Sequence, residues 1–415
     1  MTSQPDALTR LAREESGRVL ALLAARFGLE VADDAVQDAL VEALDWTTVP
    51  DNPPAWLYTV ARNRAVDRLR RAASARRRTL AAGADLAVLR PDAHDPFESG
   101  EEDDMVLDHA EVGDEQLRLM LLCCHPALAP DIQVALTLRL VGGLTTAEIA
   151  AAFVVPEATI AQRIVRAKRK IRDAGIPLSV PADLSSRVGA LLGILYLIFN
   201  EGYLSRGPAA GARLDLMEEA IRLTIRLHEV LPGDAEVEGL LALELYARSR
   251  TDARFAGGEM VLLDAQDRTL WDAELIAQAN GVLATAMRRA DPGPYQLQAV
   301  IARYHSNARE AADTDWPAIV RVYRRLLEDD PSPIVALNHA AAIAMSDGPR
   351  AGLVALDSVT GLDAYHLYWA TRGELLARGG ERDAARDALA KARRLSANPA
   401  EQRHLDRRIA ALSVD

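Results

Sequence analysis

The stretch from residue 143 to residue 172 limits the possible folds more than any other part of the chain. It reads GLTTAEIAAAFVVPEATIAQRIVRAKRKIR. Thr145 or Thr146 can cap a short helix, and Pro156 suits the first position of a second helix after a tight break. Apolar residues of the second helix are expected to share one side: Ile160, Ile164, Val165 and Ile171. This pattern predicts a helix-turn-helix.

The charges of the second helix indicate a partner with phosphates. Six Arg or Lys residues lie between positions 163 and 172, and no acid lies between Thr159 and Arg172. A helix in the major groove needs short polar side chains near its N-terminus for base edges and cations further along for phosphates. The alternative is an amphipathic helix with a solvated basic face. The expected base contacts are Glu157, Thr159, Gln162 and Arg163, and the expected phosphate contacts are Arg166, Lys168 and Lys170.

The net charge of −12 over 415 residues conceals two basic segments. Residues 1–80 hold 12 Arg or Lys residues against 11 acids, and residues 116–175 hold eight against four. Between them, residues 81–115 hold one arginine and 12 acids. Binding to nucleic acid depends on local charge, so the overall acidity does not exclude it.

The composition and the positions of the expected linker segments predict an all-α protein in several parts. The chain is 49% hydrophobic but only 5% aromatic, which favours helices over sheets. No signal peptide is evident, and the apolar run 188–199 is too short to span a bilayer, so we expect a cytoplasmic protein. The expected parts are 1–80, a flexible acidic linker 81–112, 113–175, and a C-terminal domain 183–415.

The first part reads as three helices, at about 6–27, 32–45 and 54–71. The second helix begins with an acidic cluster and continues with apolar residues, which are Val36, Leu40, Val41 and Leu44. The third is basic and follows a loop rich in turn-forming residues, WTTVPDNPP. Trp56 near its start packs in the core or offers an aromatic surface to an extruded base.

The C-terminal part reads as helix after helix, which suggests a helical-repeat solenoid. One unit, with Trp369, Gly373 and Leu389 near key positions, resembles a tetratricopeptide repeat, and a non-repetitive bundle is the alternative. Polar groups at 200–203 and 264–272 form a pocket or cap helices. The expected helices are 185–200, 215–230, 235–249, 272–289, 295–306, 316–328, 333–345, 348–358, 364–377, 382–395 and 399–412.

Two helical blocks with basic helices and an acidic linker resemble the bacterial sigma factors of the extracytoplasmic-function type. The segments DDAVQD (33–38), NPPAWL (52–57) and ARNRAVD (61–67) are similar to their region 2, and the helix-turn-helix is similar to region 4. Further segments, among them LMLLCCHPAL (119–128), YLIFNEGY (196–203) and LLDAQDRTLWD (262–272), resemble a subgroup with a tetratricopeptide-like C-terminal extension. Ala161 departs from relatives that carry an arginine there.

The resemblance implies an alternative sigma factor whose partners are core RNA polymerase and promoter DNA. It implies that the acidic cluster docks on polymerase: Asp33, Asp34, Gln37 and Asp38. In a helix of any protein these acids would also suit the N-terminal dipole. It implies that region 4 binds the −35 element and that region 2 contacts the −10 element through Asn52, Trp56, Arg62, Asn63, Arg64, Arg68 and Arg71. The extension is expected to take part in regulation through a cytoplasmic protein or ligand.

The alternative function is a stand-alone helix-turn-helix regulator with a sensing domain, which has no need of a polymerase-docking helix. An enzyme is not expected, because no catalytic constellation, phosphate loop or zincin motif is present. No cofactor or metal is expected. Cys123 and Cys124 are the two cysteines, and we expect them to be buried helix residues.

Overall fold

The structure is a computed structural model. It describes residues 8, 11–83, 109–153, 155–179, 184–203, 214–256, 259–289, 292–396 and 398–413. The chain divides into two compact units, Met1–Ile194 and Leu195–Asp415, and each is described by itself.

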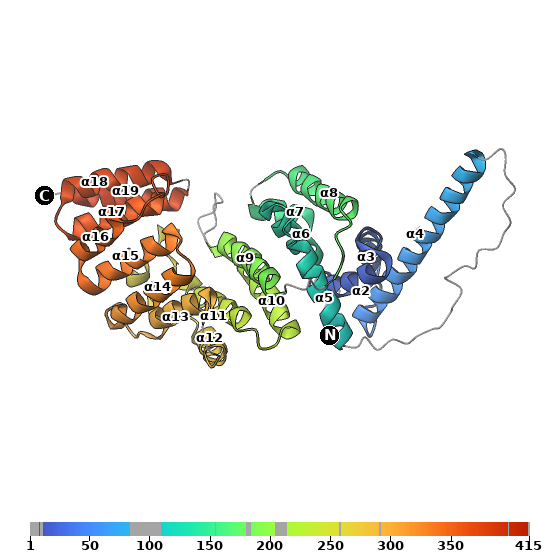
Figure 1. The fold of residues 1–415 in the computed structure, drawn as a ribbon, viewed down its shortest axis with the longest axis horizontal. Helices are drawn as coiled ribbons and strands as arrows, with labels where there is room; N and C mark the ends of the chain where they lie inside the picture. The colour runs from blue at the N-terminus through green and yellow to red at the C-terminus, as the bar shows by residue number, and fades with distance from the viewer. Residues whose placement is uncertain are drawn as a thin grey trace. The chain divides into compact units, whose positions relative to one another are not determined.

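All regular elements among the described residues of the first unit are helices (Figure 1). A π-helical turn, η1, begins it and a second, η2, follows α6. The elements are η1 (Leu11–Glu15), α2 (Ser16–Phe27), α3 (Leu29–Ala43), α4 (Pro53–Gly83), α5 (His109–Cys123), α6 (Pro130–Leu136), η2 (Thr137–Val141), α7 (Thr146–Phe153), α8 (Glu157–Asp173) and the start of α9 (Leu184–Tyr203).

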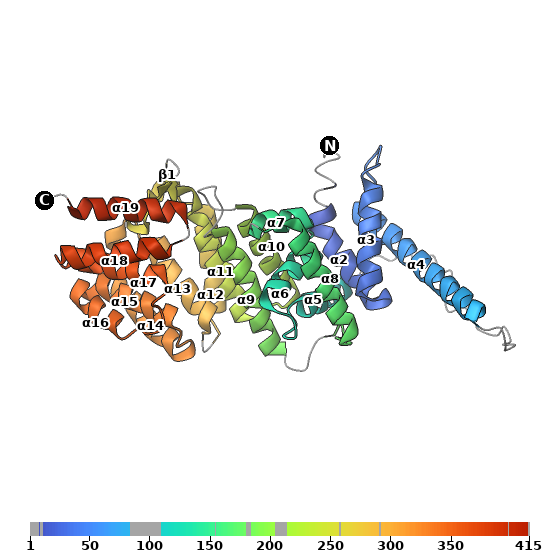
Figure 2. The ribbon, with the colours of Figure 1, turned by 90° about the horizontal axis from the view of Figure 1, so that it is seen from above.

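The three helices expected in the first block are present as α2, α3 and α4. Gly28 ends α2 with a φ of 82°, a conformation that glycine adopts without steric cost. The long helix α4 projects past α2 and α3 in both ribbon views (Figures 1 and 2). It continues to Gly83 and α5 begins at His109, so both ends of the expected linker 81–112 are helical, and residues 84–108 lie outside the described residues.

One expectation about α3 is wrong. Val41 and Leu44, which we expected in its apolar set, are 64% and 63% exposed, whereas Val36 is buried. The inward face of α3 is formed largely by small residues at helical spacing, Ala32, Ala35, Ala39 and Ala43. Alanines allow α3 to approach its partner helices closely, and Val41 lies on the opposite side of the helix.

Close backbone contacts join the two blocks within the first unit. Helix α2 packs on both α5 and η2. A Cβ on Gly17 would lie 2.6 Å from the carbonyl oxygen of Val141, so only glycine fits there without a shift. Gly143, with a φ of 68°, approaches the carbonyl of Ala12 in the same way. The first unit is therefore one packed body, with the helix-turn-helix attached to the first three helices.

The second unit is also helical, apart from a short antiparallel pair in which Phe255 faces Met260. This confirms the all-α prediction. Its elements after α9 are α10 (Leu214–Val230), α11 (Ala235–Ser249), η3 (Thr251–Ala253), β1 (Phe255–Ala256), β2 (Glu259–Met260), η4 (Leu263–Ala265), η5 (Arg268–Leu270), α12 (Ala273–Ala286), α13 (Pro294–Asn307), η6 (Ala311–Asp313), α14 (Trp316–Asp329), α15 (Pro333–Asp347), α16 (Pro349–Asp357), α17 (His366–Arg378), α18 (Arg382–Leu395) and α19 (Pro399–Ser413).

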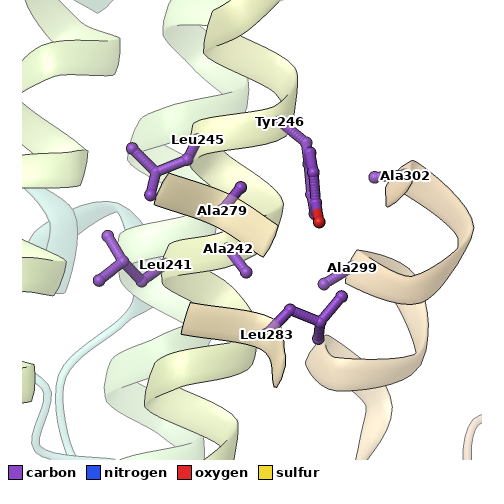
Figure 3. Packing of buried hydrophobic residues seen from close by; sticks show 8 residues of the cluster. All are labelled: Leu241, Ala242, Leu245, Tyr246, Ala279, Leu283, Ala299 and Ala302. Carbon is purple, nitrogen blue, oxygen red and sulfur yellow. The ribbon is translucent and has the colours of Figure 1, made fainter. Parts of the chain in front are cut away.

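Three helices of this unit share a core (Figure 3). Tyr246 stands on α11 with its ring toward α13, and Leu283 of α12 closes the space below it. The hydroxyl of Tyr246 donates a hydrogen bond to Oδ1 of Asn280 at 2.7 Å, so the buried ring keeps its polar end paired. The buried residues of the cluster are Leu241, Ala242, Leu245, Tyr246, Ala279, Leu283, Ala299 and Ala302.

Later helices of the unit pack as consecutive pairs, α15 with α16 and α17 with α18. In the second pair, a Cβ on Gly373 would lie 2.6 Å from Leu389. This close approach is what the expected tetratricopeptide-like unit requires at that glycine, and the repeat assignment itself stays a prediction. The polar segment 264–272 caps helices, as one of our two interpretations held: Asp267 accepts from the N–H of Thr269 at 2.9 Å and Asp272 from that of Leu275 at 3.0 Å.

Candidate nucleic-acid interface

Both helices of the helix-turn-helix begin at local signals, a capping box before α7 and a proline before α8. Thr145 and Glu148 form a reciprocal capping box: the N–H of Glu148 donates to Oγ1 of Thr145 at 3.1 Å, and the N–H of Thr145 donates to Oε2 of Glu148 at 2.7 Å. Pro156 is the N-cap residue of α8, one position earlier than we expected. The predicted pair of helices is confirmed, and Val154 of the expected break lies outside the described residues.

Helix α8 packs through one narrow stripe. Ile160 is 1% exposed and Ile164 is 7% exposed, and Ala167 and Ile171 continue the stripe along the helix. Val165 is 64% exposed, so its expected place on the buried side is wrong. Each residue advances about 100° around a helix, and Val165 therefore points well away from Ile164.

The four expected base-contacting residues lie in two different environments. Glu157 and Gln162 are exposed, whereas Thr159 and Arg163 are half-buried on one flank of α8. Nε of Arg163 forms an ion pair with Oδ2 of Asp131 on α6 at 3.2 Å. Arg163 is thus held toward its own domain, and Gln162 stands on the outward face.

The residues that we expected to contact phosphates also differ in the groups that they contact within the protein. Arg166 is exposed, and its Nε donates to the backbone carbonyl of Gln162 at 3.2 Å. Lys170 donates to the carbonyl of Ala127 in the α5–α6 loop. Lys168 pairs with Asp33 of α3, and both side chains are largely buried. Arg166 keeps an outward position suited to phosphate, while Lys168 is occupied within the first unit.

A second, exposed pair joins the same two helices. Nη1 of Arg172 lies 2.7 Å from Oε2 of Glu30 at the start of α3. The hydrogen bond to Glu30 is the main cause that raises the pKa of Arg172. Sequence reasoning missed these pairs, because residues 33 and 168 lie 135 positions apart and no local pattern links them.

The acidic cluster on α3 faces two directions. Asp33 is buried, and Asp34 and Asp38 are exposed. Both exposed carboxylates contact Arg68 of α4, at 3.0 Å from Asp34 and 2.6 Å from Asp38. The hydrogen bond to Asp38 raises the pKa of Arg68. Gln37 is half-buried between these positions. The structure thereby brings together residues that we assigned to polymerase docking and to the −10 element.

The remaining −10 candidates lie along α4. Oδ1 of Asn52 accepts a hydrogen bond from the N–H of Ala55 at 3.2 Å, so Asn52 caps the helix. Trp56 is half-buried and meets Trp46 edge to face with ring centroids 4.8 Å apart. Its ring therefore lies at the border between the core and solvent, so it contributes to packing and also keeps part of its aromatic surface accessible.

Further along α4, the candidate side chains differ in their partners and in their exposure. Arg64 pairs with Glu42 of α3 at 2.6 Å. Nε of Arg71 donates to the carbonyl of Asp67 one turn earlier at 3.2 Å. Arg62 is half-buried and Asn63 is exposed. The exposed hydrogen-bond donors along α4 are of the kind that contact the phosphates of a DNA backbone.

The two cysteines are buried, as expected, Cys123 at the end of α5 and Cys124 directly after it. Burial raises the pKa of the Cys123 thiol, and burial raises that of Cys124 to about 12. Neither thiol is therefore prepared as a nucleophile. Within the described ranges, no three His, Cys, Asp or Glu side chains gather as metal ligands, and no helix is both long and apolar enough to cross a membrane.

Comparison with known families assigns both blocks. Residues 11–75 match Sigma-70 region 2, and residues 118–171 match Sigma-70, region 4. Residues 187–287 match a family of unknown function, DUF6596.

Two relatives match over different lengths. An uncharacterized protein of Rhizobium meliloti is 40% identical over 394 residues, which cover 93% of this chain and 91% of that protein. The ECF RNA polymerase sigma factor SigK of Mycobacterium ulcerans is 32% identical over 149 residues, which cover 34% of this chain and 71% of that protein. No solved structure matches the chain.

Proposed function

The chain belongs to the sigma-70 family of RNA polymerase sigma factors, as a member of the extracytoplasmic-function type with an added C-terminal region, and we propose which of its surfaces perform each step. It is an alternative sigma factor, whose partners are core RNA polymerase and promoter DNA. The families that contain its two sigma regions are not enzymes. The ordered presence of region 2 and region 4 carries this conclusion.

The outer face of α3 docks on polymerase in this proposal. Asp34 and Asp38 are exposed there, beside Gln37. Their present partner Arg68 is itself partly exposed, and pairs of this kind contribute only about 0.2–1 kcal/mol. Exchange of Arg68 for basic side chains of polymerase therefore costs little. The exchange would also release Arg68 for DNA.

Helix α4 and the residues before it contact the −10 element. The edge-to-face pair of Trp46 and Trp56 places aromatic surface at the start of α4, where an unpaired base can stack. Beyond it the helix presents cations to the DNA backbone, together with the amide of Asn63. The proposed set is Asn52, Trp56, Arg62, Asn63, Arg64, Arg68 and Arg71.

Helix α8 enters the major groove at the −35 element. Glu157 and Gln162 are exposed near its N-terminus, and Arg166 follows one turn later, in the order that a recognition helix needs. Thr159, Arg163, Lys168 and Lys170 lie on its flanks, nearer to where phosphates would run. Because Lys168 is paired with Asp33, its phosphate contact requires that this pair opens.

The C-terminal helical domain modulates the activity of the two sigma regions. It is joined to region 4 by the short segment 174–183, and its helix pairs resemble a repeat scaffold for a regulatory protein or small ligand. We assign the protein to the cytoplasm, where core polymerase acts. The domain limits proposed from the sequence, 1–80, 81–112, 113–175 and 183–415, serve as the truncation points.

A stand-alone regulator is the competing function, and the region 2 match speaks against it. Purified full-length protein should comigrate with core RNA polymerase on size exclusion. Run-off transcription from total genomic DNA with this holoenzyme should then start at a limited set of promoters. A protein that binds DNA but neither comigrates with polymerase nor supports initiation would favour the regulator instead.

A further inference from the structure

The outward face of α8 is unusual for a helix with six basic residues. Its central positions, at helical spacing, hold Ala158, Ala161, Gln162 and Val165, all exposed. Val165 is the largest apolar side chain among them and is 64% exposed. A single exposed valine is common on protein surfaces, but this one stands on the side of α8 that a recognition helix turns to the bases.

Two basic side chains of α8 are held away from this face by ion pairs, whereas Arg169, one turn after Val165, is 73% exposed and pairs with Asp173 at 3.2 Å. Arg163 is 26% exposed and is paired with Asp131, and Lys168 is 19% exposed and is paired with Asp33. Glu157 precedes the face at the first helical position, and Arg166 follows Val165 directly. The central part therefore presents three small apolar side chains and one amide. We name Ala158, Ala161, Gln162 and Val165 the reading face.

These groups match one kind of base pair in the major groove. Thymine alone carries a C5-methyl group there, and apolar side chains contact it. Adenine presents an acceptor and a donor that a glutamine amide can bind in a bidentate manner. Guanine is most often read by arginine or lysine. The four residues of the reading face include neither, and the exposed Arg166 and Arg169 follow them further along α8.

We propose that the reading face makes the −35 element of this protein depend on A·T pairs, with Val165 and Ala161 in contact with thymine methyl groups and Gln162 bound to an adenine. This inference rests on the proposed entry of α8 into the major groove. Val165 is thus a specificity-determining residue, whose contribution is hydrophobic and is lost when one methyl group is removed from the DNA.

The test removes that methyl group without any other change. Promoters obtained from the run-off experiment are prepared with single −35 thymines replaced by uracil, and their affinity for the holoenzyme is measured at one fixed salt concentration. At least one replacement should weaken binding about two- to fourfold, the value expected for one buried methyl group. In V165A the preference for thymine over uracil should be lost at one such position, and a V165A protein that keeps the preference at every −35 thymine would refute the role of Val165.

A matched control separates this effect from general loss of an exposed valine. Val354 on α16 is 67% exposed, and V354A should keep the full preference for thymine over uracil. Equal binding of thymine and uracil promoters by the unchanged protein would overturn the inference, as would a −35 element that requires only G·C pairs. Both results would leave sigma activity intact, whereas failure of the sigma assignment would appear earlier, as absent initiation.

Discussion

The ion pair between Lys168 and Asp33 should stabilise the first unit far more than the nearby ion pair between Arg172 and Glu30 does. The two side chains are 19% and 6% exposed. Loss of one partner from a buried pair costs about 3–5 kcal/mol, because the other charge stays buried without compensation. Water reaches part of the lysine, so we expect about 2–3 kcal/mol for K168M, which keeps the apolar stem but removes the charge.

The same helices supply the control. Arg172 and Glu30 are 56% and 58% exposed, and solvent screens an exposed pair so that it contributes little to stability. Hydrogen exchange of α3 peptides in the full-length protein should therefore accelerate roughly 30- to 150-fold in K168M. In R172M the acceleration should remain below about fivefold.

A double variant tests the cause. In D33N/K168M no charge is left buried, so exchange in α3 should be slower than in K168M alone. Equal acceleration by K168M and R172M would refute the argument from burial. An additive double variant would show that the two residues do not interact.

Three further outcomes follow from the structure. Charge reversal of Asp34 and Asp38 together should abolish comigration with core polymerase while circular dichroism and melting stay near those of the unchanged protein, and a double variant that still initiates would contradict the docking surface. R166A should weaken binding to all promoters alike and lower the salt slope by about one unit, so a change in sequence preference instead would make Arg166 a base contact. Burial, together with the positive charges of Arg250 and Arg268, lowers the pKa of His305 to about 4. As pH falls, the unfolded chain therefore binds a proton at this histidine before the folded chain does, and about 3 kcal/mol of stability should be lost between about pH 6.5 and pH 4. Thermal melts in acid should show this loss for the unchanged protein and not for H305Q.

The C-terminal region calls for a separate measurement. Truncation after about residue 182 should leave a folded fragment and reduce promoter-dependent transcription, because the fragment lacks the proposed modulating domain. Circular dichroism checks the fold of the fragment, and run-off transcription measures its activity. Unchanged transcription would show that the extension does not modulate the sigma regions under the conditions used.

Much of the fold follows from local patterns. The capping box of Thr145 and Glu148, the turn before Pro156 and the glycine that ends α2 each act within a few residues. The order of basic and acidic segments, together with the region 2 and region 4 motifs, was enough to predict the family. Burial of Cys123 and Cys124 was expected because cysteine is usually buried and no second cluster of metal ligands accompanies them.

The placement of particular side chains was decided by tertiary packing. Periodicity shows which residues share a face, but the face that is buried depends on the partner helices, and this choice turned Val41 to solvent. Val165 differs, because the helical period alone separates it from Ile164 by about 100°. The pairing of Asp33 with Lys168 spans 135 residues. Such a contact depends on how α3 and α8 come together when the apolar stripes of the first unit pack, and no short-range signal carries that information.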